Sequence, residues 1–173
     1  IGNGTTVALM LAEGNIATKI GNGMTMAAMV GNANIFTHIG DGDTFAAMIG
    51  QANIFTKVGN DLTAALMVGQ ANVYTHVGNG TSIGILAGEA NIMTKVGDGT
   101  TLAAMFAKAN IMTHVGDGLT GVLALGEANI VTKVGEGFMG GGAGAKANVV
   151  AAVGDGTTAA DREVQGKRLN EGR

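Results

Sequence analysis

The chain has 173 residues, of which 31 are glycine, and it contains neither proline nor cysteine. Collagen is excluded because its triple helix needs glycine at every third position together with abundant proline, and the absence of cysteine excludes disulfides and thiolate metal sites. The net charge of -3, from 10 Lys and Arg against 13 Asp and Glu, offers no basic surface to nucleic acid, so we expect no nucleic-acid partner.

A glycine recurs every 19 residues along the chain, from Gly2 to Gly154. A fixed period of this length without insertions predicts a solenoid in which each repeat forms one coil. We expect an array of about eight coils over residues 1–158, followed by a charged tail, linker or cap over residues 159–173. The turn glycines of this array are Gly21, Gly40, Gly59, Gly78, Gly97, Gly116 and Gly135.

Residues 34–52 represent one repeat, which divides into two strands, a turn and a corner. Residues 34–39 are rich in β-branched and aromatic types, which favours a strand. The turn over residues 40–43 contains Gly40 and Gly42, which tolerate positive φ values. Residues 44–49 form the second strand and residues 50–52 the corner. The fold class predicted is all-β, a parallel β-solenoid with 19-residue coils and two sheets.

Residues 44–49 also allow a helical interpretation. Thr44 can cap a short helical turn that ends at Gly50, and alanine and methionine favour helix. An isolated helix becomes marginally stable only at about 12–15 residues, which this segment does not reach. The alternative fold, a coil with one strand and one short helical turn, stays open beside the all-β coil.

The asparagine that begins the first strand is expected to be structural. Asparagine amides stacked at about 4.8 Å can hydrogen-bond from coil to coil, as they do in cross-β structures. The predicted ladder consists of Asn15, Asn34, Asn53, Asn72, Asn91, Asn110, Asn129 and Asn148.

Lysine and histidine alternate near the end of the first strand, from Lys19 and His38 to Lys133. We expect the threonine and Ile/Val positions of this strand to point inward, which places the Lys/His column outward in solvent. Alternation lowers the repulsion between lysines from about 0.9 to about 0.4 kcal/mol, because it doubles their separation. Acidification below about pH 6.5 is predicted to protonate the histidines and to make the column a continuous row of positive charge.

Acidic residues occupy one turn position in four consecutive repeats, namely Asp98, Asp117, Glu136 and Asp155. Stacked oxygen ligands suit Ca²⁺, so calcium binding is one hypothesis. The 19-residue spacing does not match the nine-residue repeat of calcium β-rolls. The competing interpretation is that these are exposed turn carboxylates, and in that case the segment needs no cofactor.

Apolar residues occupy both alternating positions of the second strand, for example Met48 and Ile49. Only one of the two can face a thin interior, and the other face, of about 760 Å², exceeds the patch that a monomer usually exposes. Neighbouring solenoids, other parts of the same array or lipid are the expected cover. The candidate interaction face comprises Met10, Met29, Met48, Met67, Met105, Phe36, Phe55 and Tyr74.

Catalysis is not expected from this segment. The three histidines repeat one position of the coil, Ser82 is the only serine, and no phosphate-binding glycine motif occurs. The sequence therefore contains no set of nucleophile, base and acid, and no candidate catalytic residue.

The segments 37–42 (THIGDG) and 94–99 (TKVGDG) resemble the T-x-V-G-x-G repeats of multifunctional autoprocessing repeats-in-toxin (MARTX) toxins. The resemblance covers residues 1 to about 158, and it departs at Asp61 and over residues 138–152. It implies a secreted protein whose repeats form long arrays beside effector domains and act at the host plasma membrane. The function expected is a non-catalytic scaffold for assembly or effector delivery at that membrane. The alternative is an extracellular fibre or adhesin stalk that assembles laterally through apolar faces.

Overall fold

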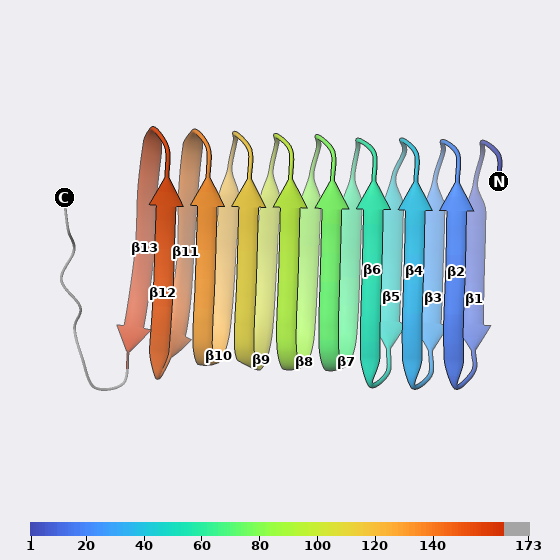
Figure 1. Cartoon of the computed structure of the whole chain (residues 1–173), viewed down its shortest axis with the longest axis horizontal. Coiled ribbons are helices and arrows are strands. Elements are labelled where there is room, and N and C mark those ends of the chain that lie inside the picture. Colours follow the sequence, from blue (N-terminus) through green and yellow to red (C-terminus); the bar gives the residue numbers. More distant parts are fainter. Residues whose placement is uncertain (165–173) are drawn as a thin grey trace.

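The computed structural model describes residues 1–164, which form a parallel β-solenoid of two facing layers (Figure 1). The all-β prediction is confirmed, and residues 44–49, where a helical turn was the alternative, form a strand. No helix long and apolar enough to cross a membrane is present in residues 1–164. The strands are β1 (Thr6–Leu11), β2 (Gly14–Ile20), β3 (Thr25–Val30), β4 (Ala33–Ile39), β5 (Thr44–Ile49), β6 (Ala52–Val58), β7 (Thr63–Val77), β8 (Ser82–Val96), β9 (Thr101–Val115), β10 (Thr120–Val134), β11 (Gly137–Ala145), β12 (Ala147–Val153) and β13 (Gly156–Val164).

The two layers differ in the side chains that they direct inward. One layer, which we call the methionine sheet after Met29 and Met48, contains β1, β3, β5, β11, β13 and the first parts of β7 to β10. The other, which we call the asparagine sheet after Asn34 and Asn53, contains β2, β4, β6, β12 and the second parts of β7 to β10. Strands β7 to β10 bend round the corner between the layers without a break.

Each strand pairs in parallel with the equivalent strand of the next coil, and every paired residue lies opposite the residue 19 positions on. Met29 pairs with Met48, and Asn34 pairs with Asn53. Columns of the sequence are therefore columns in space. Strand β13 pairs with β11 and continues the array past residue 158. Residues 165–173 of the expected tail lie outside the described residues.

The interior is a thin layer of large side chains from both sheets. Met48, Phe55 and Tyr74 are fully buried. The ring centroids of Phe36 and Phe55 lie 5.0 Å apart, and those of Phe55 and Tyr74 lie 5.1 Å apart, with nearly parallel planes. In-register stacking thus puts aromatic faces in contact along the solenoid axis, a favourable arrangement when the rings are offset.

The direction predicted for the side chains of the first strand is wrong. In β4, Asn34, Phe36 and His38 are buried, whereas Ile35 and Ile39 are exposed on the outer face. Burial of an aromatic ring removes more apolar area from water than burial of threonine or isoleucine, and the amide on the same side of the strand finds hydrogen-bond partners inside.

The same finding corrects the candidate interaction face, which belongs to the core. Seven of its side chains are buried and the eighth, in the first coil, is partly buried against them: Met29, Met48, Met67, Met105, Phe36, Phe55 and Tyr74, and then Met10.

The turn glycines meet two requirements at once. Gly78 has φ +139°, and a Cβ atom placed on it would lie 2.3 Å from the carbonyl oxygen of Gly59 in the preceding coil. A side chain here would strain the backbone and push the coils apart. Asp61 (φ 84°) is the one residue other than glycine with positive φ in the described part of the chain.

Candidate functional site

The asparagine column links the coils inside the solenoid. The Nδ2 atom of Asn53 donates to Oδ1 of Asn34 at 2.6 Å, and Nδ2 of Asn91 donates to Oδ1 of Asn110 at 3.0 Å. The pairs Asn72–Asn91, Asn110–Asn129 and Asn129–Asn148 make the same contact at 2.7, 2.8 and 3.0 Å. In the first coil, Asn15 instead donates to the carbonyl of Val30. The amides also bond to carbonyls at the end of the methionine sheet, as Asn91 does to Leu86 at 2.9 Å. The ladder therefore ties coil to coil and layer to layer.

The Lys/His column lies inside the solenoid. The expectation that these side chains point outward into solvent is therefore wrong. Lys57 and Lys95 are fully buried, and their ammonium groups donate to the carbonyls of Gly40 and Gly78 in the preceding turns. The ammonium group of Lys19 donates to the carbonyl of Gly2, and that of Lys133 donates to the backbone carbonyls of Gly116 at 3.2 Å and Glu136 at 2.7 Å. Carbonyl acceptors partly replace the water that these cations lose on burial.

The histidines bond to the equivalent glycine carbonyls of the other coils. The Nε2 atom of His38 lies 3.0 Å from the carbonyl of Gly21, and Nε2 of His76 lies 2.9 Å from that of Gly59. A neutral ring that donates from Nε2 accepts at Nδ1, so the hydroxyl of Thr44 donates to His38. Lysine and histidine are therefore alternative donors to one glycine carbonyl per coil.

Burial keeps these histidines neutral. It lowers the pKa of His38 and His114, and it lowers the pKa of His76 to about 4. The neighbouring lysines act in the same direction, whereas the hydrogen bonds to glycine carbonyls oppose the shift. Burial also lowers the pKa of the Lys57 and Lys95 ammonium groups, against the attraction of acidic turn residues such as Asp41 and Asp98. The predicted row of positive charge below pH 6.5 is thus wrong, because acidification must first overcome burial.

The acidic turn residues link each turn to the next by hydrogen bonds from side chain to backbone. An Oδ1 atom of Asp98 accepts the backbone N–H of Asp117 at 3.0 Å, and Oδ1 of Asp117 accepts that of Glu136 at 2.7 Å. Asn22 and Asn60 make the same contact in other coils, so the column works with either side chain. The described residues contain no group of three or more His, Asp or Glu side chains that could hold a metal ion.

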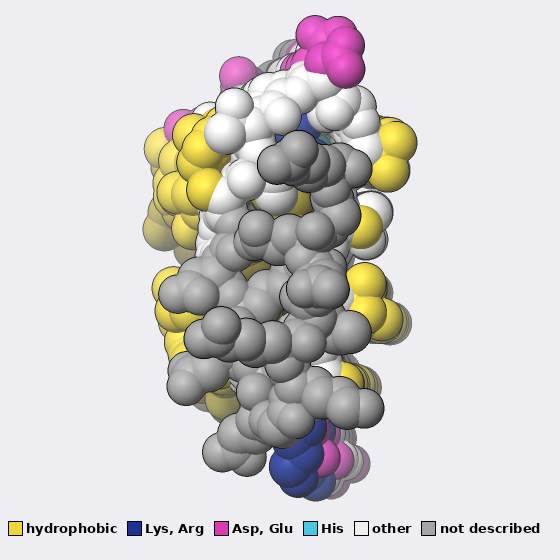
Figure 2. Space-filling model, turned by 90° about the vertical axis from the view of Figure 1, so that its left-hand side faces the viewer, with side chains coloured by type: hydrophobic (Ala, Val, Ile, Leu, Met, Phe, Trp, Pro, Cys, Tyr) yellow, Lys and Arg dark blue, Asp and Glu magenta, His cyan; other side chains and the backbone are white. Residues whose placement is uncertain are grey.

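Both broad outer faces of the solenoid are apolar, as Figure 2 shows in a view along the axis. The outer face of the methionine sheet carries rows such as Leu9, Leu66 and Ile85. The outer face of the asparagine sheet carries two rows of exposed Ile and Val, which flank a half-buried row of threonine that includes Thr37. These rows are the exposed apolar surface, in place of the methionine and aromatic columns that the sequence indicated.

Charged side chains gather at the two narrow edges (Figure 2). The acidic turns form one edge. At the other, Lys108 lies 3.4 Å from Glu89 and Lys146 lies 3.7 Å from Glu127, with all four side chains exposed. The described solenoid is therefore a slab with two apolar broad faces and two polar edges.

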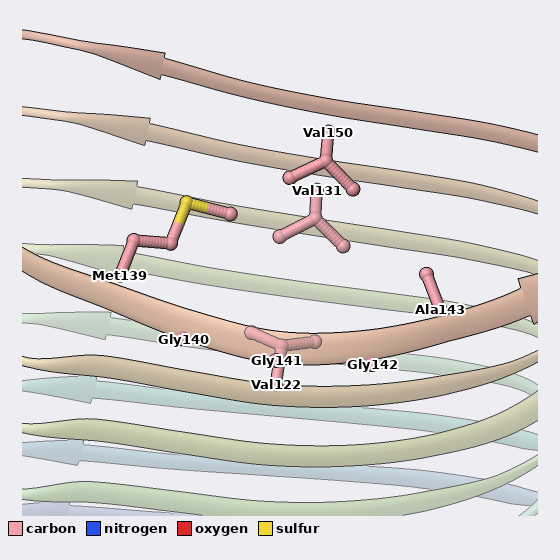
Figure 3. Close-up of a pocket in the computed structure, with 8 residues that line it drawn as sticks. All are labelled: Val122, Val131, Met139, Gly140, Gly141, Gly142, Ala143 and Val150. Carbon is pink, nitrogen blue, oxygen red and sulfur yellow. The ribbon is translucent and has the colours of Figure 1, made fainter. Parts of the chain in front are cut away.

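Two hollows in the described residues bear on the outer faces and the interior. A groove of about 740 Å³ runs over the outer face of the methionine sheet. Residues of β1, β3, β5, β7 and β8 line it, among them Ala28, Phe45 and Leu66. The second is a partly open gap of about 10 Å³, the size of a water molecule, between the two layers near the carboxyl end of the described residues. There Val131 and Val150 face Val122, Met139 and Ala143 across the interior (Figure 3). Smaller side chains replace methionine and aromatic residues in these coils, and the cavity is a packing gap.

The exposed rows of Ile and Val on the asparagine sheet could have been predicted from the asparagine column. Its amides must pair inside, and residues two and four positions later lie on the same side of the strand. Phe36 and His38 follow Asn34 at those positions, so Ile35 and Ile39 must point outward.

A family model described as the RtxA repeat matches seven segments that together cover more than half of the chain: residues 10–27, 29–46, 48–65, 67–84, 87–103, 105–120 and 124–137. No curated protein and no solved structure matches the chain.

Proposed function

This chain belongs to the RtxA repeat family, and we propose that its solenoid is a non-catalytic scaffold that supports effector delivery by lying against the host membrane. RtxA repeats are structural repeats of secreted MARTX toxins. The repeat array is therefore a structural segment, and the proposal concerns what that segment contacts.

The observation that carries the proposal is the slab with apolar broad faces and charged edges. Ile54 and Ile92 on the asparagine sheet are about two-fifths exposed, although nothing in their chemistry favours water. Burial of half of a face of about 760 Å² at about 25 cal/mol per Å² contributes about 9 kcal/mol. This is enough to hold the slab against an apolar surface while its charged edges stay in water.

Liposome co-sedimentation of the purified chain, with and without calcium, tests this function. We expect the chain to pellet with the liposomes. The double variant Ile54→Asp/Ile92→Asp should pellet less, because each carboxylate would have to leave water when the asparagine sheet lies on lipid. The control Gln51→Asp/Gln70→Asp changes two exposed corner residues and should pellet like the unchanged chain. A chain that stays a monodisperse monomer and ignores lipid would contradict the proposal.

A second candidate, a lateral structural fibre, is favoured by the presence of apolar faces on opposite sides of the slab. With an apolar face on each side, solenoids can stack face to face into an open filament, because each added copy presents a further free face. Electron microscopy of the chain without lipid distinguishes the two functions, since only the fibre requires ordered filaments under those conditions.

A further inference from the structure

Large and small side chains alternate at two outward positions of the methionine sheet in β3, β5, β7, β9 and β10, whereas β1 (Val7, Leu9) and β8 (Ile83, Ile85) carry two large side chains there. In β5 the large Phe45 stands two residues before Ala47, and in β7 the order is reversed, with Ala64 before Leu66. The pairs Leu102–Ala104 and Gly121–Leu123 repeat the exchange. In the five strands that alternate, a large side chain stands beside a small one, an arrangement that lets an opposing surface interdigitate with this face.

The chemistry of this face restricts what can cover it. From β1 to β10 its outward positions carry only apolar residues, and they include Leu9, Ile49 and Phe106. The asparagine sheet differs, because its outer face has a threonine row between its apolar rows. A protein partner for the methionine sheet must therefore present an uncharged surface of similar extent.

We propose that the outer face of the methionine sheet binds the same face of a second copy of this chain, as a closed two-fold pair. The side-chain rows repeat at about 4.8 Å along the axis, and another solenoid of the same coil supplies the same spacing. Each face offers about 760 Å², close to the roughly 800 Å² per partner of a stable complex.

The face is also self-complementary in shape. The groove of about 740 Å³ lies over β1, β3, β5 and the first parts of β7 and β8, and Ala28 and Ala47 contribute to its lining. Bulky exposed side chains, among them Phe106, Leu123 and Leu125, stand beyond the groove on the same face. Grooves and ridges on one patch are what an isologous pair requires, because each copy supplies both.

Lipid explains these features less well. Acyl chains are fluid and adapt to any apolar relief, so they give no reason for Phe45 and Leu66 to exchange sizes with their neighbours. The pair leaves the outer face of the asparagine sheet free for the membrane contact proposed above. The inference rests on the proposed function only in treating the broad faces as contact surfaces.

Sedimentation equilibrium of the full chain without lipid tests the pair. We expect a dimer that Leu66→Asp weakens by about 100-fold, because the carboxylate would be buried without a partner. The matched control Ile54→Asp, on the opposite face and similarly exposed, should leave the dimer unchanged. Far-ultraviolet circular dichroism checks that both variants keep their β-structure.

Three results would overturn the inference: a monomeric chain, equal weakening by the two variants, or assembly beyond the dimer. Each is separable from the liposome experiment. A monomer that still pellets with liposomes refutes the pair and retains the membrane function, while a dimer that ignores liposomes does the reverse.

Discussion

The Nδ1 atom of His38 lies 2.6 Å from the hydroxyl oxygen of Thr44, while Nε2 of the same ring reaches the carbonyl of Gly21 at 3.0 Å. One imidazole therefore joins the end of the asparagine sheet to the start of the methionine sheet and to the preceding coil. In the next coil Lys57 donates to the equivalent carbonyl, that of Gly40. The Lys/His alternation is thus a structural device of the interior, and its energetics can be measured.

Acidification should destabilise the solenoid through the buried histidines. The pKa of His76 is about 4 in the fold and near 6.5 when unfolded. Between these values the unfolded chain binds more protons, so stability is complete above about pH 6.5 and falls as pH drops toward 4. The slope is at most about 1.4 kcal/mol per pH unit for one ring. Urea unfolding at pH 7.5 and pH 5 measures it, and His76→Gln should flatten the dependence. Equal midpoints for the original chain at both pH values would contradict the prediction.

Loss of one ladder amide should cost about 1–3 kcal/mol. Asn91→Ala removes the hydrogen bonds that this amide donates to Asn110 and Leu86 and the one that it accepts from Asn72. The urea midpoint should fall, whereas Gln70→Ala at an exposed corner should leave it within about 0.5 kcal/mol. An Asn91→Ala variant as stable as the control would show that the ladder is dispensable.

Reversal of a buried charge should be severe. Lys57→Glu puts a carboxylate against the carbonyl of Gly40 in a site that excludes water, and we expect a loss of about 3 kcal/mol or more, or failure to fold. Lys108→Glu is the control, because that side chain is exposed and its ion pair with Glu89 is worth at most about 1 kcal/mol. Thermal melting compares the two variants, and similar melting temperatures would argue against a buried role for Lys57.

Turn glycines should not tolerate alanine. Gly78→Ala introduces a Cβ atom 2.3 Å from the carbonyl oxygen of Gly59 at φ +139°, and we expect a loss of at least about 2 kcal/mol. Gly14→Ala, where a Cβ atom meets nothing within 4 Å, should be nearly neutral. Chemical unfolding of both variants is the measurement. A Gly78→Ala chain as stable as Gly14→Ala would mean that the turns can separate freely.

Much of the fold follows from periodicity. The interval between Gly40 and Gly59 defines the coil, and alternation in residues 34–39 defines a strand, because both depend on local backbone geometry. The asparagine ladder follows from the in-register stacking of identical coils. The direction of Phe36 and His38 did not follow, since the rule that places charged groups outside takes no account of acceptors supplied by another coil.

The amino-acid sequence alone determined the 19-residue coil, its two strands, its glycine turns and the apolar character of both outer surfaces, because each of these repeats along the chain. Only the tertiary structure decided which side of each strand became the interior. That choice depends on contacts between residues 17 positions apart, such as the bond from Lys57 to the Gly40 carbonyl. A buried cation is stable only where a hydrogen-bond acceptor replaces its lost water, and stacking of the coils places the glycine carbonyl of the preceding coil in that position.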